Sequence, residues 1–176
     1  SPSMDILVSS NLERLLFHLS KNHNYVARLM KELSENGSYT VDNDIFEMIK
    51  NDFACGCATD DEVCGAIRNV FKGGKYLSDT HTAVAFKVYE DYKKNTGDKN
   101  VTVICSTASP FKFPKAVIAA LGGKAPEDDF DAIVNLENMT NAKAPENLSN
   151  LRNKEVRFTK VINPDEIENL VIESYK

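Results

Sequence analysis

The chain has 176 residues, of which 42% are hydrophobic and 27% charged, a composition typical of one globular domain and not of a disordered protein. Its 26 acidic and 21 basic residues give a formal net charge of −5, and no block of lysine or arginine offers a surface for nucleic acid or an anionic membrane. The longest apolar run, residues 116–121, is too short to span a bilayer, and residues 1–20 lack a signal-peptide layout. We therefore expect a cytoplasmic protein without nucleic-acid or membrane partners.

Two amphipathic helices are predicted at the start of the chain. Ser10 and Glu13 are spaced as a capping box, in which each side chain binds a backbone amide at the helix start. Leucines at helical spacing follow: Leu12, Leu15, Leu16 and Leu19. The second helix has apolar side chains over residues 25–33 and should end at Gly37. Residues 53–58 then form a weak predicted strand.

Two more helices are predicted in the middle of the chain. Thr59 and Glu62 repeat the capping-box spacing, and the helix after them should stop at the glycine pair 73–74. The next helix covers residues 82–95, which have apolar side chains at helical spacing. It should close at Gly97, because glycine readily adopts the left-handed backbone of a helix end.

Residues 101–105 form the best predicted strand, since they are β-branched and almost wholly apolar, as in a strand covered on both faces. A further helix should begin with Pro114 at its first position and stop at the glycine pair 122–123. Two polar segments, residues 122–129 and 138–153, are interpreted as loops or elaborated connections.

Residues 156–161 alternate between apolar and polar side chains, as in an edge strand. Asn163 starts the last predicted helix, whose inner face would hold Ile167, Leu170 and Val171. Alternating helices and strands predict a layered, helix-rich α/β fold with a partial, mostly parallel sheet. With so few strands, that sheet is expected to be part of a larger one.

The first candidate site follows the strand that ends at Cys105. Hydroxyl side chains at residues 106–109 lie between this strand and the next helix. Ligands of open α/β sheets bind at the carboxyl ends of strands, and hydroxyls can bond a heteroaromatic nitrogen or a phosphate oxygen. The alternative is a plain strand-to-helix connection whose hydroxyls cap backbone groups.

The second candidate site is the polar cluster 79–82 at the start of a helix. His81 could bind an anion or transfer protons, with Asp79 as the group that orients it. The alternative is that Asp79 or Thr80 caps the helix and His81 is solvated in its first turn.

The cysteines are Cys55, Cys57, Cys64 and Cys105. They are too few and too unevenly placed for a disulfide framework, so reduced thiols are expected. Their spacing is not the usual spacing of a zinc site, and no metal is predicted, although a thiol-ligated metal is kept as a hypothesis.

Three blocks of the sequence resemble threonine synthase in its longer bacterial and fungal form. Residues 1–16 (SPSMDILVSSNLERLL) resemble an internal segment of that family. DTHTAV at residues 79–84 resembles its D-P-H-T-A-V, and STASPFKFP at residues 106–114 resembles its S-T-A-H-P-A-K-F-P. The blocks match in order and spacing, and the resemblance covers essentially all 176 residues.

The resemblance implies that residues 1–176 are the C-terminal portion of a pyridoxal-phosphate (PLP) lyase with a fold similar to the tryptophan synthase β subunit. The family converts O-phospho-L-homoserine and water to L-threonine and phosphate. By resemblance, Thr107 faces the pyridine nitrogen of the cofactor and leaves it largely unprotonated, because a neutral hydroxyl favours that form. Ser106 lies beside it in the implied cofactor site.

Two parts of the family site are missing from these residues. No lysine has the G-P-T-x-x-F-K-D context of the Schiff-base lysine, since Lys112 matches another family position, and the glycine-rich phosphate loop is absent. We expect the missing N-terminal portion to supply both and this chain alone to be inactive. Thr80 and Ser109 stand where the family often has proline and histidine, so the roles of His81 and Ser109 stay open.

The alternative is a free-standing, non-catalytic α/β module that starts at Met4 and binds a small anion or a protein partner. Such a module should have a self-sufficient core and no large exposed apolar patch, whereas a portion of a larger enzyme should expose one.

Overall fold

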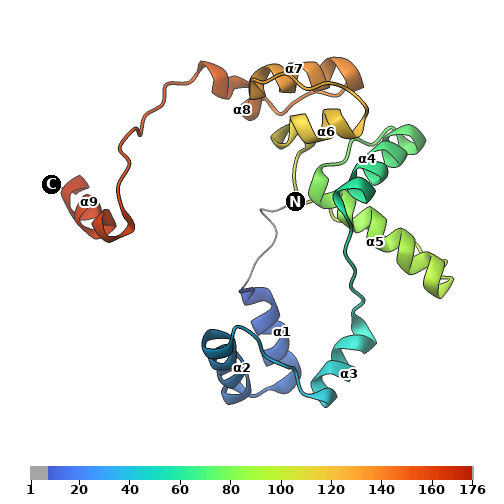
Figure 1. Ribbon diagram of the computed structural model, residues 1–176, viewed down its shortest axis with the longest axis vertical. Coiled ribbons are helices and arrows are strands. Elements are labelled where there is room, and N and C mark those ends of the chain that lie inside the picture. The colour runs from blue at the N-terminus through green and yellow to red at the C-terminus, as the bar shows by residue number, and fades with distance from the viewer. Residues whose placement is uncertain (1–7, 176) are drawn as a thin grey trace.

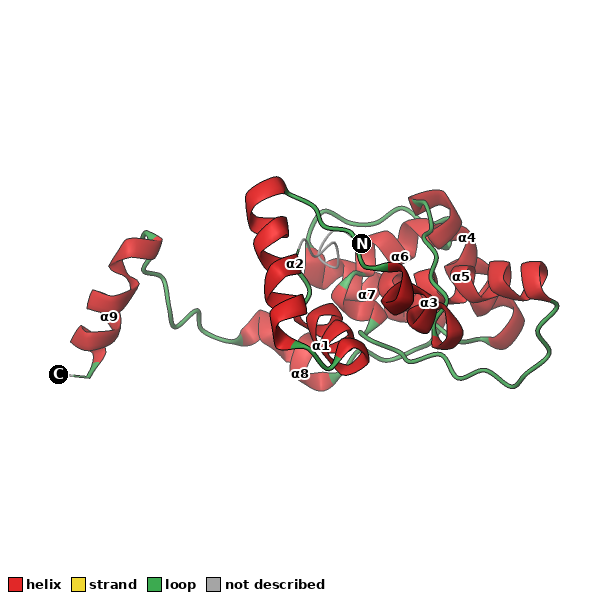
Figure 2. Ribbon diagram, turned by 90° about the horizontal axis from the view of Figure 1, so that it is seen from below, coloured by secondary structure: helices red, strands yellow, loops and turns green. Residues whose placement is uncertain are grey.

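The computed structural model describes residues 8–175, and every regular element in that range is a helix, as Figure 1 and Figure 2 show. The α-helices are α1 (Ser10–Ser20), α2 (His23–Asn36), α3 (Asn43–Asp52), α4 (Asp60–Gly74), α5 (Thr80–Thr96), α6 (Pro114–Ala120), α7 (Asp129–Thr140), α8 (Glu146–Ser149) and α9 (Ile167–Ser174). Three short 3₁₀ helices in the described range are η2 (Pro110–Lys112), η3 (Asn150–Asn153) and η4 (Pro164–Glu166). The expectation of a start at Met4 concerns residues outside this range.

The helices pack into two clusters that are joined by the extended residues 53–59 (Figure 1). Helices α1, α2 and α3 enclose a small core of Leu16, Leu29 and Ile45. Helices α4 to α7 and η2 enclose a larger one, made of Val63, Ala66, Ile67, Ala83, Phe111, Val117, Ile118, Ala120, Ala132, Ile133 and Leu136. The second cluster contains both candidate sites, so its packing positions them.

Most of the predicted helices and their ends are confirmed. Thr59 and Glu62 form the expected capping box at the start of α4, and Gly97 ends α5 with a positive φ of 71°. Asn163 and Glu166 form another capping box before α9. The capping box predicted at Ser10 is wrong, because α1 begins at Ser10 itself after Ser9, whose side chain makes no capping bond.

Helices α3 and α7 were not among the predicted elements. Helix α7 starts after Asp128, whose carboxylate accepts a hydrogen bond from the backbone N–H of Asp131. It runs through Thr140, and α8 and η3 follow soon after, so the loop interpretation of residues 138–153 holds only in part.

The predicted partial, mostly parallel sheet is wrong, since residues 8–175 contain no strand. In the segment 101–105, Val101 is 99% and Val103 is 84% exposed, and the segment 156–161 is equally open at Phe158 (84%). A strand is stable only when a neighbouring strand takes up its backbone N–H and C=O groups. The side-chain pattern of these segments is that of strands, but the described chain offers them no such neighbour.

The C-terminal segment extends away from both clusters to α9, which stands apart in Figure 2. The predicted inner face of this helix is not buried, since Ile167 is 52% and Val171 is 50% exposed. Among residues 8–175, no helix combines the length and the apolar character needed to cross a bilayer.

Candidate functional site at the start of α5

The start of α5 is built around the buried carboxylate of Asp79, which is 1% exposed. Its Oδ1 accepts hydrogen bonds from the backbone N–H groups of His81 (2.8 Å) and Thr82 (3.0 Å). Its Oδ2 accepts a bond from the Thr82 hydroxyl at 2.5 Å. Asp79 is therefore the N-cap of α5, which confirms the capping alternative for this residue.

The hydroxyl of Thr82 also binds the other candidate segment. Its oxygen accepts a hydrogen bond from the backbone N–H of Thr107 at 3.1 Å, and Thr82 is 2% exposed. Beside it, the Tyr76 hydroxyl donates to the Ser106 hydroxyl oxygen at 3.0 Å. The structure thus brings the two candidate sites together, although they are far apart in the sequence.

Thr107 and Ser106 are both exposed, and Thr107 lies in the wall of an open cavity of about 840 Å³. One wall is the face of α5 that carries Val88 and Tyr92. The other walls are the extended segments 54–57 and 102–105. The volume is in the range of small-molecule sites, and Thr107 supplies a hydroxyl to it.

His81 and Ser109 have separate surroundings. His81 is half-buried, with its ring edge-on to the ring of Phe113 at a centroid distance of 4.8 Å. Ser109 caps η2 by accepting a hydrogen bond from the backbone N–H of Phe111 at 3.3 Å. With Lys112, Ser109 lines a different cavity, of about 360 Å³, beside α8. Neither Ser109 nor Lys112 lines the cavity of Thr107.

The four cysteines, Cys55, Cys57, Cys64 and Cys105, are free thiols. Cys55, Cys57 and Cys105 line the Thr107 cavity, whereas Cys64 packs against the larger core. Within residues 8–175, no group of three or more histidine, cysteine or acidic side chains is arranged to hold a metal ion.

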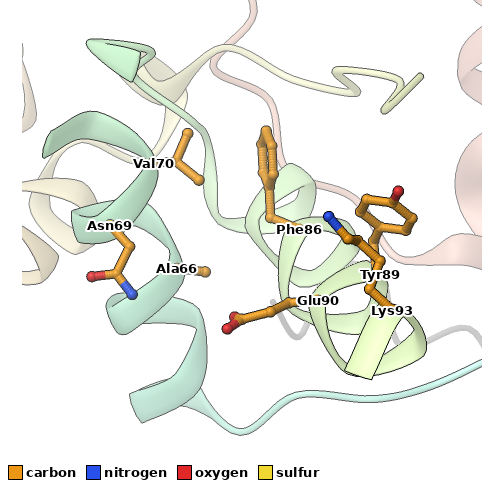
Figure 3. Close-up of a pocket in the computed structure, with 7 residues that line it drawn as sticks. All are labelled: Ala66, Asn69, Val70, Phe86, Tyr89, Glu90 and Lys93. Atoms are coloured by element: carbon orange, nitrogen blue, oxygen red, sulfur yellow. The ribbon is translucent and has the colours of Figure 1, made fainter. Parts of the chain in front are cut away.

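Another groove lies between α4 and α5 (Figure 3). Its volume is about 250 Å³, and Val70 and Phe86 form much of its apolar wall. The charged groups that line it are Glu90 and Lys93. Neither candidate segment, 79–82 nor 106–109, contributes to this groove.

One ion cluster ties α4 to α5 close to these cavities. The Lys87 ammonium lies 3.3 Å from the carboxylate of Glu62 and 2.5 Å from that of Asp91. The pKa of Lys87 is raised, first by the bond to Asp91 and then by Glu62. The pKa of Glu62 is lowered, first by the backbone N–H of Thr59, then by the Thr59 hydroxyl and by Lys87. These pKa shifts arise from the ion pairs and the capping box of α4 and α5, and no residue of the candidate site causes them.

The sequence predicted roles for Thr107, Ser106 and Asp79, but it predicted none for Tyr76 or for the hydroxyl of Thr82. Tyr76 precedes Ser106 by 30 residues, and no pattern in the sequence pairs them. Thr82 lies in the block DTHTAV, three residues after Asp79. Its spacing from the predicted cap residue is the signal that could have identified it.

Comparison with known proteins places these residues in a family. Residues 82–171, just over half of the chain, match the family model described as threonine synthase, C-terminal. The chain belongs to the threonine synthase family. The predicted resemblance to the C-terminal portion of threonine synthase is therefore confirmed.

Threonine synthase relatives extend well beyond this segment. The threonine synthase of Schizosaccharomyces pombe is 38% identical over 133 residues, which cover 69% of this chain and 26% of that protein. The structure of PLP-bound threonine synthase from Brucella melitensis matches 99% of this chain and 34% of its own, with 30% identity and a TM-score of 0.74. Yeast threonine synthase gives a TM-score of 0.76 at 27% identity, with 99% of this chain and 36% of its own covered. The chain thus spans about a quarter of the length of its curated relatives.

Proposed function

We propose that this chain is part of a PLP-dependent threonine synthase, a lyase that converts O-phospho-L-homoserine and water to L-threonine and phosphate. The observation that carries the proposal is the Thr107 hydroxyl, which is exposed in a cavity wall while its backbone is bound to α5. Family membership and the PLP-bound relative from Brucella melitensis support it.

Thr107 has the chemistry that the nitrogen end of the cofactor requires. When bound, PLP supplies a pyridine ring that acts as an electron sink. A neutral hydroxyl donates to the unprotonated ring nitrogen, whereas a carboxylate in its place would favour the protonated form. The cavity beside Thr107, about 840 Å³, is large enough for a ligand of this size. The residues present therefore fit the nitrogen end of the cofactor, with Ser106 next to Thr107 at its edge.

The remainder of the active site would come from a separate, N-terminal portion of the enzyme. No lysine among the 176 residues has the sequence context of the family's Schiff-base lysine, and no glycine-rich phosphate loop is present. We propose that this portion supplies both groups, and that the four free thiols reflect a cytoplasmic location.

The large apolar side chains left exposed favour this reading over a free-standing module. Several lie on the extended segments that the sequence predicted as strands, among them Val101, Val103, Phe158 and Val161. A self-sufficient module is not expected to expose so many apolar residues. No observation in the described residues favours an independent anion-binding function.

The test is a substitution of Thr107 in the full-length protein that contains these residues. Thr107→Val removes the hydroxyl at nearly constant side-chain volume. The rate of threonine formation should fall about tenfold, because the loss of one hydrogen bond changes a rate by about that factor. The cofactor absorbance should change as well, with an unaltered far-UV circular dichroism spectrum.

Thr107→Ser is the matched control, because it keeps the hydroxyl and should retain most of the turnover. If Thr107→Val leaves both the turnover and the cofactor spectrum unchanged, Thr107 does not contact the cofactor and the proposal is wrong.

A further inference from the structure

Thr82 connects the buried cap of α5 to the backbone of Thr107. Its oxygen accepts the N–H of Thr107 at 3.1 Å, and it lies 2.5 Å from Oδ2 of Asp79. A backbone N–H can only donate and a carboxylate can only accept. The single proton of the Thr82 hydroxyl must therefore point to Asp79, and a lone pair of its oxygen accepts the N–H of Thr107. The direction of both bonds follows from this chemistry.

The carboxylate at the end of this chain of bonds is itself held in place. Its other oxygen accepts two backbone N–H groups at the start of α5, a helix of 17 residues whose N-terminus favours a negative charge. Asp79 is 1% and Thr82 is 2% exposed, so neither group can exchange its partner for water without opening the packing. Asp79 and Thr82 thus form a rigid anchor.

Apart from the hydrogen bond that the Tyr76 hydroxyl donates to Ser106, the segment that ends at Thr107 has little else to hold it. None of the backbone–backbone hydrogen bonds in the described range involves residues 101–107. Most of this segment is exposed. The hydrogen bond from the Thr107 amide to Thr82 is therefore a principal constraint on where the Thr107 side chain lies.

We propose that Asp79 and Thr82 are positioning residues, which hold the backbone at Thr107 so that its hydroxyl is presented to the ligand in the cavity. This inference rests on the proposed function for the identity of that ligand, the pyridine nitrogen of PLP. Asp79 and Thr82 act through Thr107 and need not touch the cofactor or the substrate.

The positioning role can be separated from the capping role. The N-cap needs only Oδ1 of Asp79, whereas the link to Thr107 needs the Thr82 hydroxyl. Thr82→Val keeps the shape of the side chain and the two backbone bonds of the cap, but it removes the acceptor for Thr107 and the donor to Oδ2 of Asp79. Thr82→Ser keeps the hydroxyl and is the rescue variant.

The first measurement is hydrogen exchange at the Thr107 amide in the full-length protein that contains these residues. The amide should be protected in the parent chain, exchange roughly tenfold faster in Thr82→Val, and recover in Thr82→Ser. The amides of His81 and Thr82, which bind Asp79, report whether the cap is intact. An unprotected Thr107 amide in the parent chain, or equal protection in Thr82→Val, overturns the proposal.

Asp79→Asn provides a second test if Thr82→Val does not fold. Asparagine retains a side-chain oxygen for the N-cap, but its amide group donates to the Thr82 oxygen where the carboxylate accepted from it. The Thr82 hydroxyl then loses the acceptor that orients it toward Thr107. The expected result is faster exchange at Thr107 with the α5 amides still protected. Equal protection at Thr107 would contradict the proposal.

The second measurement uses the full-length holoenzyme and the cofactor absorbance as a function of pH. Thr82→Val should alter this titration in the same direction as Thr107→Val, and the double variant should be no more altered than Thr107→Val. If Thr107→Val changes the titration but Thr82→Val does not, the positioning role is wrong and the proposed function stands. If Thr107→Val changes nothing, the proposed function itself fails.

Discussion

At the residue scale, the candidate site depends on a few buried polar groups whose hydrogen bonds are complete. Asp79 and Thr82 have almost no contact with solvent, and each polar atom described there has a partner. An unpaired polar group at such a site would cost about 1–3 kcal/mol, so the buried groups retain a single arrangement. Thr107 itself is exposed, and a buried neighbour fixes its backbone.

The ion cluster of Glu62 and Lys87 leads to a prediction at the same scale. The pKa of Glu62 is lowered from its usual 4.5 by the Thr59 amide and hydroxyl and by Lys87. Its stabilising contribution is therefore complete above about pH 4.5 and is lost as the pH falls through the lower folded-state value. Glu62→Gln should consequently lessen the fall in the free energy of unfolding between about pH 6 and pH 3.

Urea unfolding at a series of pH values measures this effect. Glu47→Gln is a suitable control, since Glu47 is an exposed partner of Lys50 on α3 and takes no part in the contact between α4 and α5. If the parent chain and Glu62→Gln lose stability in parallel on acidification, Glu62 contributes nothing to the acid response.

At the element scale, capping residues close to each helix end in the sequence determined most of the helix ends, whereas a strand requires a neighbouring strand to pair with. Thr59 and Glu62 satisfy each other's nearby backbone groups, so their spacing is sufficient to predict the start of α4. Val101 and Val103 have an equally clear strand pattern, yet they are exposed and unpaired. Alternating or β-branched side chains show only that these residues would suit a strand. Pairing also requires the backbone of a second strand, and the nearby sequence does not provide one.

The end of α5 gives a prediction about such a local signal. Gly97 has a φ of 71°, where a side chain is strained, so Gly97→Ala should lower the free energy of unfolding by about 1–2 kcal/mol. Gly73 is the matched control: it lies within α4 with no atom close to an added Cβ, and Gly73→Ala should raise stability by up to about 1 kcal/mol.

Thermal and urea unfolding of both variants measure the contrast. Effects of the same sign and size at the two positions would show that the backbone conformation at Gly97 is unimportant.

At the scale of the whole molecule, the described chain has two cores that share no residue. One lies among α1, α2 and α3, and the other among α4 to α7. The helix pairs that pack most closely belong to the same cluster, such as α1 with α2 and α4 with α5. Residues 53–59, which connect the two clusters, are extended. Separate cores linked in this way are expected to open separately.

Substitutions in the two cores test this independence. Leu29 and Leu136 are each fully buried, one in each core, so replacement by alanine should cost about 2–5 kcal/mol locally. Leu29→Ala should speed amide exchange in α1 to α3 and leave α4 to α7 unchanged, and Leu136→Ala should do the reverse. If either substitution speeds exchange equally in both clusters, the molecule unfolds as one unit.

The sequence by itself determined the helices with clear caps, the family, and the position of Thr107 as a candidate. Each of these depends on residues close together in the chain, such as Asn163 and Glu166, or on blocks recognised in order. The tertiary structure alone decided that residues 101–105 are unpaired, that Ser109 and Lys112 face another cavity, and that Thr82 holds Thr107. These outcomes depend on which distant segments meet, and burial and hydrogen-bond partners are set only when the chain has packed.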